Sequence, residues 1–217
     1  MKRFEFEQLS PEWMAARCGL PTSSNFGSLI TPSGKPSKQA DEYCNRCIAD
    51  IVCGEISERF QTSFWMEQGV AMEVEAADWY AFETGFDLAK VGFITDDEGR
   101  WGASPDRIVM RDGEEIGALE IKCPAPWTHV ENILRGSIKR THIPQVQGQM
   151  LIGWFAWVDW VSYHPDFGGF VVRIERDEEY IEGLQVALER FSASKQEKIA
   201  RLVELGIMTN GKEKDDG

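Results

Sequence analysis

Charged residues placed inside otherwise apolar strands set the strongest limit on the fold of this chain. Between residues 91 and 123, the segments VGFITDD, DRIVMR and EIGALEIKC are rich in branched residues and are separated by turn signals, which predicts antiparallel strands. Because side chains alternate between the two faces of a strand, Glu120 and Lys122 point one way, and Leu119 and Ile121 the other. A carboxylate and an ammonium group therefore lie together between apolar neighbours.

The register of the predicted hairpin decides whether a second carboxylate joins this pair. Asp112-Gly113 marks the turn, and neighbouring strands lie about 4.8 Å apart, so Asp106 should return to the neighbourhood of Glu120. A hairpin with only these two turn residues would set Asp106 opposite Leu119, on the wrong face. A loop of three or five residues, or a bulge, sets it opposite Glu120 instead. We predict this second register.

Two neighbouring carboxylates repel each other unless a positive charge lies between them, and a divalent cation with oxygen ligands is the usual solution. Magnesium suits such a site. The alternative is an exposed Asp and a surface Glu-Lys pair, since charged residues normally lie on solvated faces. However, an Asp before a hairpin followed by Glu-x-Lys in an apolar strand is the PD-(D/E)xK nuclease pattern. The chain has it complete as Pro105-Asp106, Glu120 and Lys122.

The remaining patterns predict one α/β domain with a central mixed sheet flanked by helices. Ser10-Pro11 signals a first helix, and Asp177 caps a long last helix that reaches about residue 205. Further helices are expected at about 22–30, 37–53, 66–83, 127–135 and 143–153, and strands at 156–163 and 169–175. We expect a single domain over residues 1–210 and a flexible tail over 211–217.

Composition limits the class of protein further. The 217 residues carry a net charge of −13, from 36 acidic and 23 basic residues, which argues against a simple DNA-coating protein. It leaves room for an enzyme with a local basic track, because steering depends on the local field. Five cysteines, an odd number, fit reduced thiols. Without an apolar run of 18 residues or a signal peptide, we expect a cytoplasmic protein with no membrane segment.

The chain resembles the lambda-type phage exonucleases, also called the viral recombinase or alkaline exonuclease family, over residues 10–165. The resemblance implies a restriction-endonuclease-like, PD-(D/E)xK core. The segments that carry it are Trp13 to Ser24 (WMAARCGLPTSS), Gly69 to Glu73 (GVAME), Ser104 to Asp106 with Glu120 to Pro124 (EIKCP), and Gln145 to Gln147 (QVQ).

The resemblance also implies roles for individual residues. Asp106 and Glu120 would bind the metal, with the backbone carbonyl of Ile121 as a further ligand. Lys122 would orient or deprotonate the attacking water. The implied cofactor is magnesium, as two ions, with manganese as a substitute.

Two further residues, Glu73 and Gln145, are implied as catalytic. Glu73 would bind a second metal ion or position water, and it interrupts an expected apolar stripe of Met66, Val70, Val74, Ala77 and Ala81. A carboxylate there is costly unless it is paired or binds a metal. Alternatively, Glu73 lies at the edge of the stripe and its carboxylate reaches solvent. The alternative for Gln145 is a position on an ordinary polar helix face.

In this family an arginine and serines hold the 5′ phosphate of the cut strand, and Arg17, Ser24 and Ser104 match those positions. A planar guanidinium binds phosphate through two hydrogen bonds. Alternatively, Arg17 is a favourable positive charge at a helix C-terminus.

The chain departs from the family at its second phosphate-binding arginine, which falls here on Thr128 beside His129. Arg135, Lys139 or Arg140 could substitute for it from nearby, or the phosphate is held more weakly. We leave the replacement unassigned.

The implied function is a magnesium-dependent 5′-to-3′ exodeoxyribonuclease that acts on linear double-stranded DNA with a 5′-phosphorylated end. It would leave 3′ single-stranded overhangs for a phage-type single-strand annealing protein. The family also implies a homotrimeric ring around the DNA, which would reconcile an acidic exterior with a basic channel. The alternatives are a RecB-like nuclease, an endonuclease of the same fold, or a noncatalytic DNA-binding module.

Overall fold

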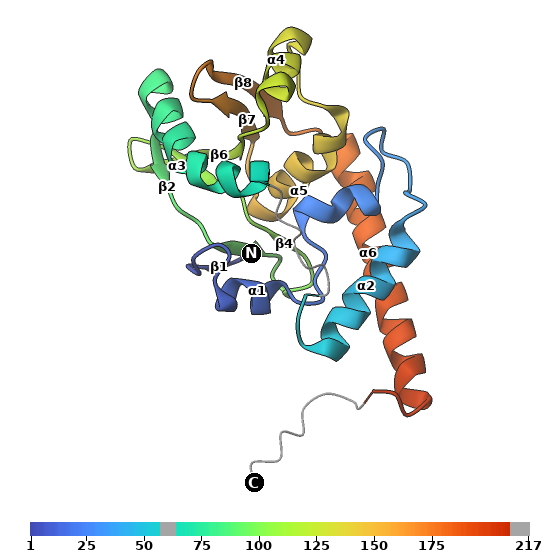
Figure 1. The fold of residues 1–217 in the computed structure, drawn as a ribbon. Coiled ribbons are helices and arrows are strands. Elements are labelled where there is room, and N and C mark those ends of the chain that lie inside the picture. The colour runs from blue at the N-terminus through green and yellow to red at the C-terminus, as the bar shows by residue number, and fades with distance from the viewer. Residues whose placement is uncertain (57–63, 209–217) are drawn as a thin grey trace.

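The computed structural model describes residues 1–56 and 64–208, with the backbone alone over residues 64–71 (Figure 1). The expected tail at 211–217 and the side chains of Met66 and Val70 therefore lie outside the described residues. No helix of the described chain is long and apolar enough to cross a membrane.

A five-stranded mixed sheet forms the centre of the molecule, in the order β2-β5-β6-β7-β8. The long strand β6 (Glu114–Lys122) pairs antiparallel with β5 (Arg107–Arg111) and parallel with β7 (Trp157–His164). The outer strands are β2 (Asp87–Ala89) beside β5 and β8 (Gly168–Glu175) beside β7, both antiparallel. This arrangement confirms the predicted central mixed sheet.

The sheet is covered on both faces by helices, as its two hydrophobic clusters show. On one face, α3 (Phe64–Thr84) packs Tyr80 against residues of β6 and β7. On the other face, α5 (Ile143–Gly153) packs Val146 and Met150 against Ala118 and Trp160. The long helix α6 (Glu178–Glu204) and α2 (Ala40–Cys53) extend this second layer and run side by side in Figure 1.

The boundaries of most helices agree with the sequence expectations. Ser10 accepts a hydrogen bond from Trp13 N–H and begins α1 (Pro11–Arg17), and Asp177 likewise caps α6. Helix α4 (Pro126–Arg135) precedes the short 3₁₀ helix η2 (Arg140–His142). The helix expected at residues 22–30 is instead the 3₁₀ helix η1 (Ser23–Ser28), and the Thr22 side chain forms no capping hydrogen bond.

The segment VGFITDD does not join the central sheet. Its strand, β3 (Phe93–Thr95), lies between β1 (Lys2–Phe4) and β4 (Gly102–Ala103) in a second, antiparallel sheet. Strands β1, β2 and β4 have only two or three residues each, which is too short for a period-two pattern to be recognised.

The hairpin of β5 and β6 has the predicted register, and a bulge produces it. Asp112 and Gly113 form a two-residue turn with φ of 53° and 81°, so that Arg111 pairs with Glu114. The pairing then shifts between Val109 and Met110, and Arg107 lies opposite Leu119. The pairing ends there, and the preceding residue, Asp106, lies beside the part of β6 that contains Glu120.

The expected apolar stripe of α3 is wrong in one position. Ala76, Ala77 and Tyr80 are buried against the sheet and Trp79 packs beside them, whereas Val74 is 57% exposed. The helix carries apolar residues on more than one side, so the sequence alone did not select the buried side.

Gly117 in β6 gives a stability prediction. A Cβ atom there would lie 2.6 Å from three ring atoms of Trp157, whose indole stacks on the Arg173 guanidinium at 3.6 Å. We expect Gly117→Ala to lower the free energy of unfolding by about 1–3 kcal/mol, as overpacking usually does. Chemical denaturation measures this change.

Gly183 in α6 is the matched control, because a Cβ there would meet no atom closer than 3.6 Å. Gly183→Ala should leave stability unchanged or raise it by about 0.5–1 kcal/mol through helix propensity. Equal stabilities for Gly117→Ala and the wild type would contradict the packing argument.

Candidate active site

The hairpin brings two carboxylates to neighbouring positions. The Asp106 N–H, just before the first residue of β5, donates to the Leu119 carbonyl at 3.0 Å. The Asp106 Oδ2 then accepts a hydrogen bond from the Ile121 N–H at 2.6 Å. Glu120, between these two residues of β6, is only 2% exposed. The predicted convergence of Asp106 and Glu120 is therefore present.

Both oxygens of the buried Glu120 carboxylate have donors. Lys122 Nζ donates to Oε1, as the shared strand face requires, and Gln145 Nε2 donates to the same oxygen at 2.6 Å. Gln149 Nε2 donates to Oε2 at 2.5 Å. Gln145 was expected here, whereas Gln149 was missed, although its spacing of four residues from Gln145 places it on the same helix face.

The electrostatics of the site disfavour the simultaneous ionisation of its two neighbouring carboxyl groups. Burial raises the pKa of Asp106 well above its usual range, and the charge of Glu120 raises it further. Burial acts to lower the pKa of Lys122, but the charges of Glu120 and Asp106 outweigh burial and raise it. One ammonium thus faces two carboxylates, which favours the binding of an additional cation.

The oxygen donors of the site fit a divalent cation such as magnesium. Asp106 and Glu120 offer hard carboxylate oxygens, and the Asp106 carboxylate is held by a backbone N–H. Among the side chains described, those of residues 1–56 and 72–208, no three from His, Cys, Asp or Glu converge as a metal-binding group. The carbonyl of Ile121 remains a predicted ligand.

Glu73 lies near the two acids but has a partner of its own. Arg107 Nη1 donates to Glu73 Oε1 at 2.8 Å and also to the Asp106 carbonyl at 2.5 Å. The charge of Glu73 also contributes to the raised pKa values of Asp106 and Lys122. Sequence analysis missed Arg107, and the proposed metal-binding or water-positioning role of Glu73 stays a prediction.

A second cluster gathers the residues expected to hold a phosphate. Arg17 Nη1 donates to Ser104 Oγ at 3.3 Å, and its Nη2 donates to Thr22 Oγ1 at 3.2 Å and to Ser24 Oγ at 3.3 Å. These residues come from α1, η1 with its N-cap, and the segment after β4. The three predicted residues are thus brought together, and Thr22 is an addition that sequence analysis missed.

The indole ring of Trp13 stacks against the guanidinium of Arg17. The Arg17 guanidinium lies 3.9 Å from the centre of the indole ring, and Trp13 Nε1 donates to Ser104 Oγ at 3.1 Å. Burial lowers the pKa of Arg17 to about 10. Within the described part of the chain, Arg17 forms no ion pair with a carboxylate. A charged guanidinium whose side-chain partners are hydroxyl groups is well suited to an incoming anion.

The candidates for a second phosphate-binding cation differ in their availability. Arg135 donates to Asn132 Oδ1 at 2.9 Å and pairs with Glu131, and Lys139 lies 3.2 Å from Glu131. Arg140 is exposed and has no ion-pair partner among the described residues.

Two histidines near these cations, His129 and His142, could in principle add positive charge. His129, next to Thr128, is fully buried and its Nδ1 lies 2.8 Å from Ser162 Oγ. Burial and the charge of Lys122 lower the pKa of His142 to about 4, so this imidazole is neutral near pH 7. Neither histidine supplies a positive charge at neutral pH.

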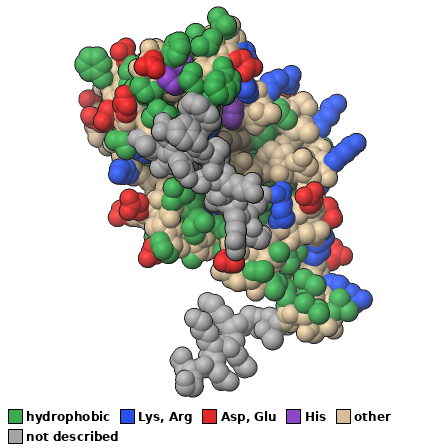
Figure 2. Space-filling model, viewed as in Figure 1, with side chains coloured by type: hydrophobic (Ala, Val, Ile, Leu, Met, Phe, Trp, Pro, Cys, Tyr) green, Lys and Arg blue, Asp and Glu red, His purple; other side chains and the backbone are tan. Residues whose placement is uncertain are grey.

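Charge is unevenly distributed on the molecular surface. Figure 2 shows Lys and Arg side chains gathered along the right-hand edge of the visible face, with Asp and Glu side chains grouped at the upper left. The net negative charge of the chain therefore does not describe each part of its surface.

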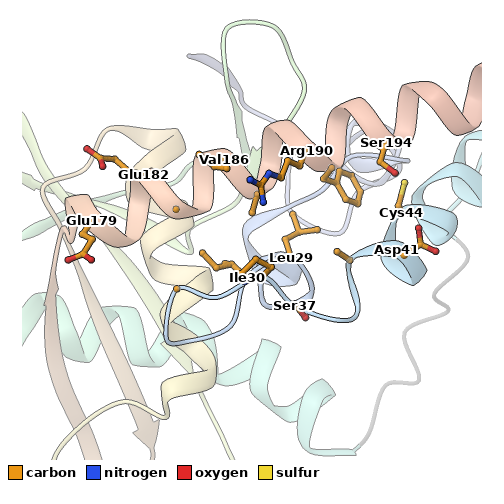
Figure 3. A pocket seen from close by; sticks show the side chains of 16 residues that line it. Leu29, Ile30, Ser37, Asp41, Cys44, Glu179, Glu182, Val186, Arg190 and Ser194 are labelled. Atoms are coloured by element: carbon orange, nitrogen blue, oxygen red, sulfur yellow. The ribbon is translucent and has the colours of Figure 1, made fainter.

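A cavity of about 550 Å³ lies away from both clusters, between α2, α6 and the loop that joins η1 to α2 (Figure 3). Leu29, Ile30 and Phe191 form part of its apolar wall, and Arg190 and Glu182 lie at its border. None of the residues predicted for the metal or phosphate sites lines it.

Comparison with known proteins shows several similarities. The model of the YqaJ-like viral recombinase domain matches residues 12–154. An alkaline exonuclease from Laribacter hongkongensis is 32% identical, covers 91% of this chain and 98% of its own, and has a TM-score of 0.80. The same enzyme in complex with dAMP has a TM-score of 0.81, with the same identity and coverage.

A phage related exonuclease from Haemophilus somnus 129PT has the same fold, with a TM-score of 0.64 and 15% identity over 84% of this chain and 96% of its own. The search of curated proteins found no match.

The buried acids predict an unusual effect on stability in metal-free protein. The pKa of Asp106 is higher in the folded chain than in the unfolded chain, so folding favours its protonated form. The wild type should therefore lose stability as the pH rises from about 4 through the raised pKa. The Asp106→Asn variant has no such charge to bury. In EDTA, its stability relative to the wild type should therefore increase between pH 5 and pH 8.

A difference of about 2–4 °C in melting temperature corresponds to about 1 kcal/mol for a chain of this size. Asp97→Asn is the control, since Asp97 is exposed and its contact with the chain N-terminus lowers its pKa. The melting temperature of Asp97→Asn should not exceed that of the wild type at pH 8 in EDTA. A lower melting temperature for Asp106→Asn than for the wild type at pH 8 in EDTA would refute the electrostatic argument.

Proposed function

Since the chain belongs to the YqaJ-like viral recombinase family, and is a nuclease acting on DNA, we propose that it is a magnesium-dependent 5′-to-3′ exodeoxyribonuclease. Its substrate is linear double-stranded DNA, and its product carries 3′ single-stranded overhangs. The observation that carries this proposal is the convergence of Asp106, Glu120 and Lys122, with Gln145 bonded to the same carboxylate.

In this proposal Asp106, Glu120 and the Ile121 carbonyl hold magnesium, with manganese as a substitute, and Glu73 serves a second ion. A bound divalent cation polarises the scissile phosphate and offsets the charge that develops on its oxygens. The oxygen donors support this assignment, as does the close approach of two carboxyl groups that a bound cation would stabilise in their ionised forms. For Glu73 to bind an ion, Arg107 has to release it or share it.

Lys122 acts on the attacking water. Because the neighbouring carboxylates raise its pKa, the side chain is an ammonium near neutral pH. An ammonium next to Glu120 Oε1 can orient a water molecule and stabilise negative charge on the phosphate. This supports orientation of the water rather than removal of its proton by Lys122 in the resting enzyme.

Arg17, Ser24 and Ser104 hold the 5′ phosphate of the strand that is cut. Their hydrogen bonds already order the guanidinium over Trp13, so a phosphate meets donors with fixed positions. A phosphate bound there would limit cleavage to strands with a free 5′ end. This anchor is the physical basis that we propose for the direction of degradation.

We further propose that three copies form a ring around the DNA, with Arg135, Lys139 and Arg140 facing the channel, and that a single-strand annealing protein binds the exposed 3′ strand. A basic track inside the ring would reconcile the net charge of −13 with DNA binding, because steering depends on the local field. A closed ring would also keep the enzyme on its substrate.

One end-labelled linear duplex, compared with a closed circular duplex, tests the reaction. With magnesium, a 5′ label should be released early as a nucleotide, a 3′ label should stay on long fragments, and the circle should remain intact. EDTA should stop all release. Lys122→Ala should lower the rate at least about 100-fold, in the range of lost general acid-base and electrostatic assistance.

Lys198→Ala is the matched control, since Lys198 pairs with Asp41 between α6 and α2, and it should keep the wild-type rate. Cutting of the circle would indicate an endonuclease, and early release of the 3′ label would reverse the proposed direction. Undiminished hydrolysis by folded Lys122→Ala would exclude the proposed role of this lysine.

The phosphate anchor predicts selectivity for the chemistry of the DNA end. Arg17→Ala should lose about 10- to 100-fold in kcat/KM on 5′-phosphorylated ends, which corresponds to about 1.5–3 kcal/mol for charge-assisted hydrogen bonds. On 5′-hydroxyl ends the same variant should act like the wild type. Steady-state rates on the two duplexes measure the difference.

Arg100→Ala is a suitable control, because Arg100 also stacks on a tryptophan, Trp101, at 4.3 Å but pairs with Asp96. It should not discriminate between the two ends. An equal loss on both ends for Arg17→Ala would remove the anchor role from this arginine.

A further inference from the structure

Gln149 is a fully buried polar side chain whose one hydrogen bond among the described residues goes to Glu120. It lies in α5 one turn after Gln145, so the two amides lie one above the other on the same helix face. Each amide donates to a different oxygen of the Glu120 carboxylate. Gln145 donates to Oε1, and Gln149 donates to Oε2.

A glutamine is a poor choice at this position for packing alone. The Gln149 Oε1 is buried and has no hydrogen-bond partner in the described part of the chain. Leaving a buried carbonyl oxygen unsatisfied is unfavourable, whereas Met would fill a similar volume without a polar atom. The hydrogen bond to a charged carboxylate is the interaction that offsets this penalty.

No neighbouring side chain replaces Gln149 as a donor to Oε2. Trp160 pairs with Glu120 across β6 and β7 and is 1% exposed, but its Nε1 has no partner among the described residues. The other donors to the carboxylate, Lys122 and Gln145, both approach Oε1. Gln149 is therefore the one side-chain donor to Oε2 among the described residues, and three donors together hold the carboxylate.

We propose that Gln149 is a positioning residue that holds Oε2 of Glu120 and thereby fixes the orientation of a carboxylate that would bind the cation. This role rests on the proposed metal-dependent function. Residues that orient a metal ligand typically change metal affinity or activity by about 10- to 100-fold when they are replaced. Gln149 would act in this way without touching the cation or the DNA.

The test compares Gln149→Met with Gln147→Met. Gln147 is a buried glutamine of the same helix, but it bonds to the Glu175 carbonyl and the Asp177 N–H, away from Glu120. For Gln149→Met, the magnesium concentration that gives half of the thermal stabilisation should rise about 10- to 100-fold. Its kcat should fall while KM for DNA stays unchanged. Gln147→Met should lower the melting temperature in EDTA but keep the wild-type response to magnesium.

A cycle with Glu120→Met tests the same contact without metal. In EDTA, Gln149→Met should lower the melting temperature of the wild type, because it leaves Oε2 without a donor. In the Glu120→Met background it should raise the melting temperature, because it removes an amide that has lost its partner. If Gln149→Met does not fold, Gln149→Asn, shorter by one methylene, replaces it in both measurements.

The outcomes separate this proposal from the function on which it rests. If magnesium does not raise the melting temperature of the wild type, the metal site is rejected. The cycle in EDTA would then show whether Gln149 holds the Glu120 carboxylate. An unchanged magnesium response for Gln149→Met, beside a normal response of the wild type, would overturn the positioning role. So would an effect of Gln149→Met on the melting temperature that is the same with and without Glu120.

Discussion

The hydrogen bonding of one buried carboxylate fixes how the layers of this protein fit together. Glu120 is nearly inaccessible to solvent, so its charge depends on donors supplied by the protein. Two of these donors, Gln145 and Gln149, come from α5. To reach Glu120, the helix has to lie at a defined position along β6 and with a defined rotation about its own axis. Gln147 ties the same helix to the segment between β8 and α6. A polar contact thus sets the alignment of an otherwise apolar interface.

The second acid depends on backbone geometry instead. Asp106 reaches the side of Glu120 because one extra residue in the hairpin restores the parity that a two-residue turn would break. Its carboxylate is then held by a main-chain N–H, and nearby Arg107 bonds to Glu73. Two like charges can remain close in the folded chain because the sheet is stabilised by packing on both faces.

Sequence patterns predicted the central elements of the fold and the convergence of Asp106 with Glu120, because strand alternation and hairpin parity are strict local rules. They did not identify Gln149, whose importance appears only when the height of α5 over β6 is known. The orientation of α3 was also beyond local rules, as the exposure of Val74 shows. The gathering of Arg17, Ser24 and Ser104 was expected from family resemblance, since no periodicity links residues so distant in sequence.

The parallel pairing of β6 with β7 requires a crossover, and α4 and α5 lie within it. Glu120, Lys122 and both amides are consequently encoded by one continuous stretch between Glu114 and His164, whereas Asp106 and the Arg17 cluster are encoded before it. The two parts are nevertheless joined in space, because α5 packs against η1, where Gly148 leaves no room for a side chain beside Phe26. A displacement of α5 would therefore move the amide donors of Glu120 and the η1 hydroxyl partner of Arg17 at the same time.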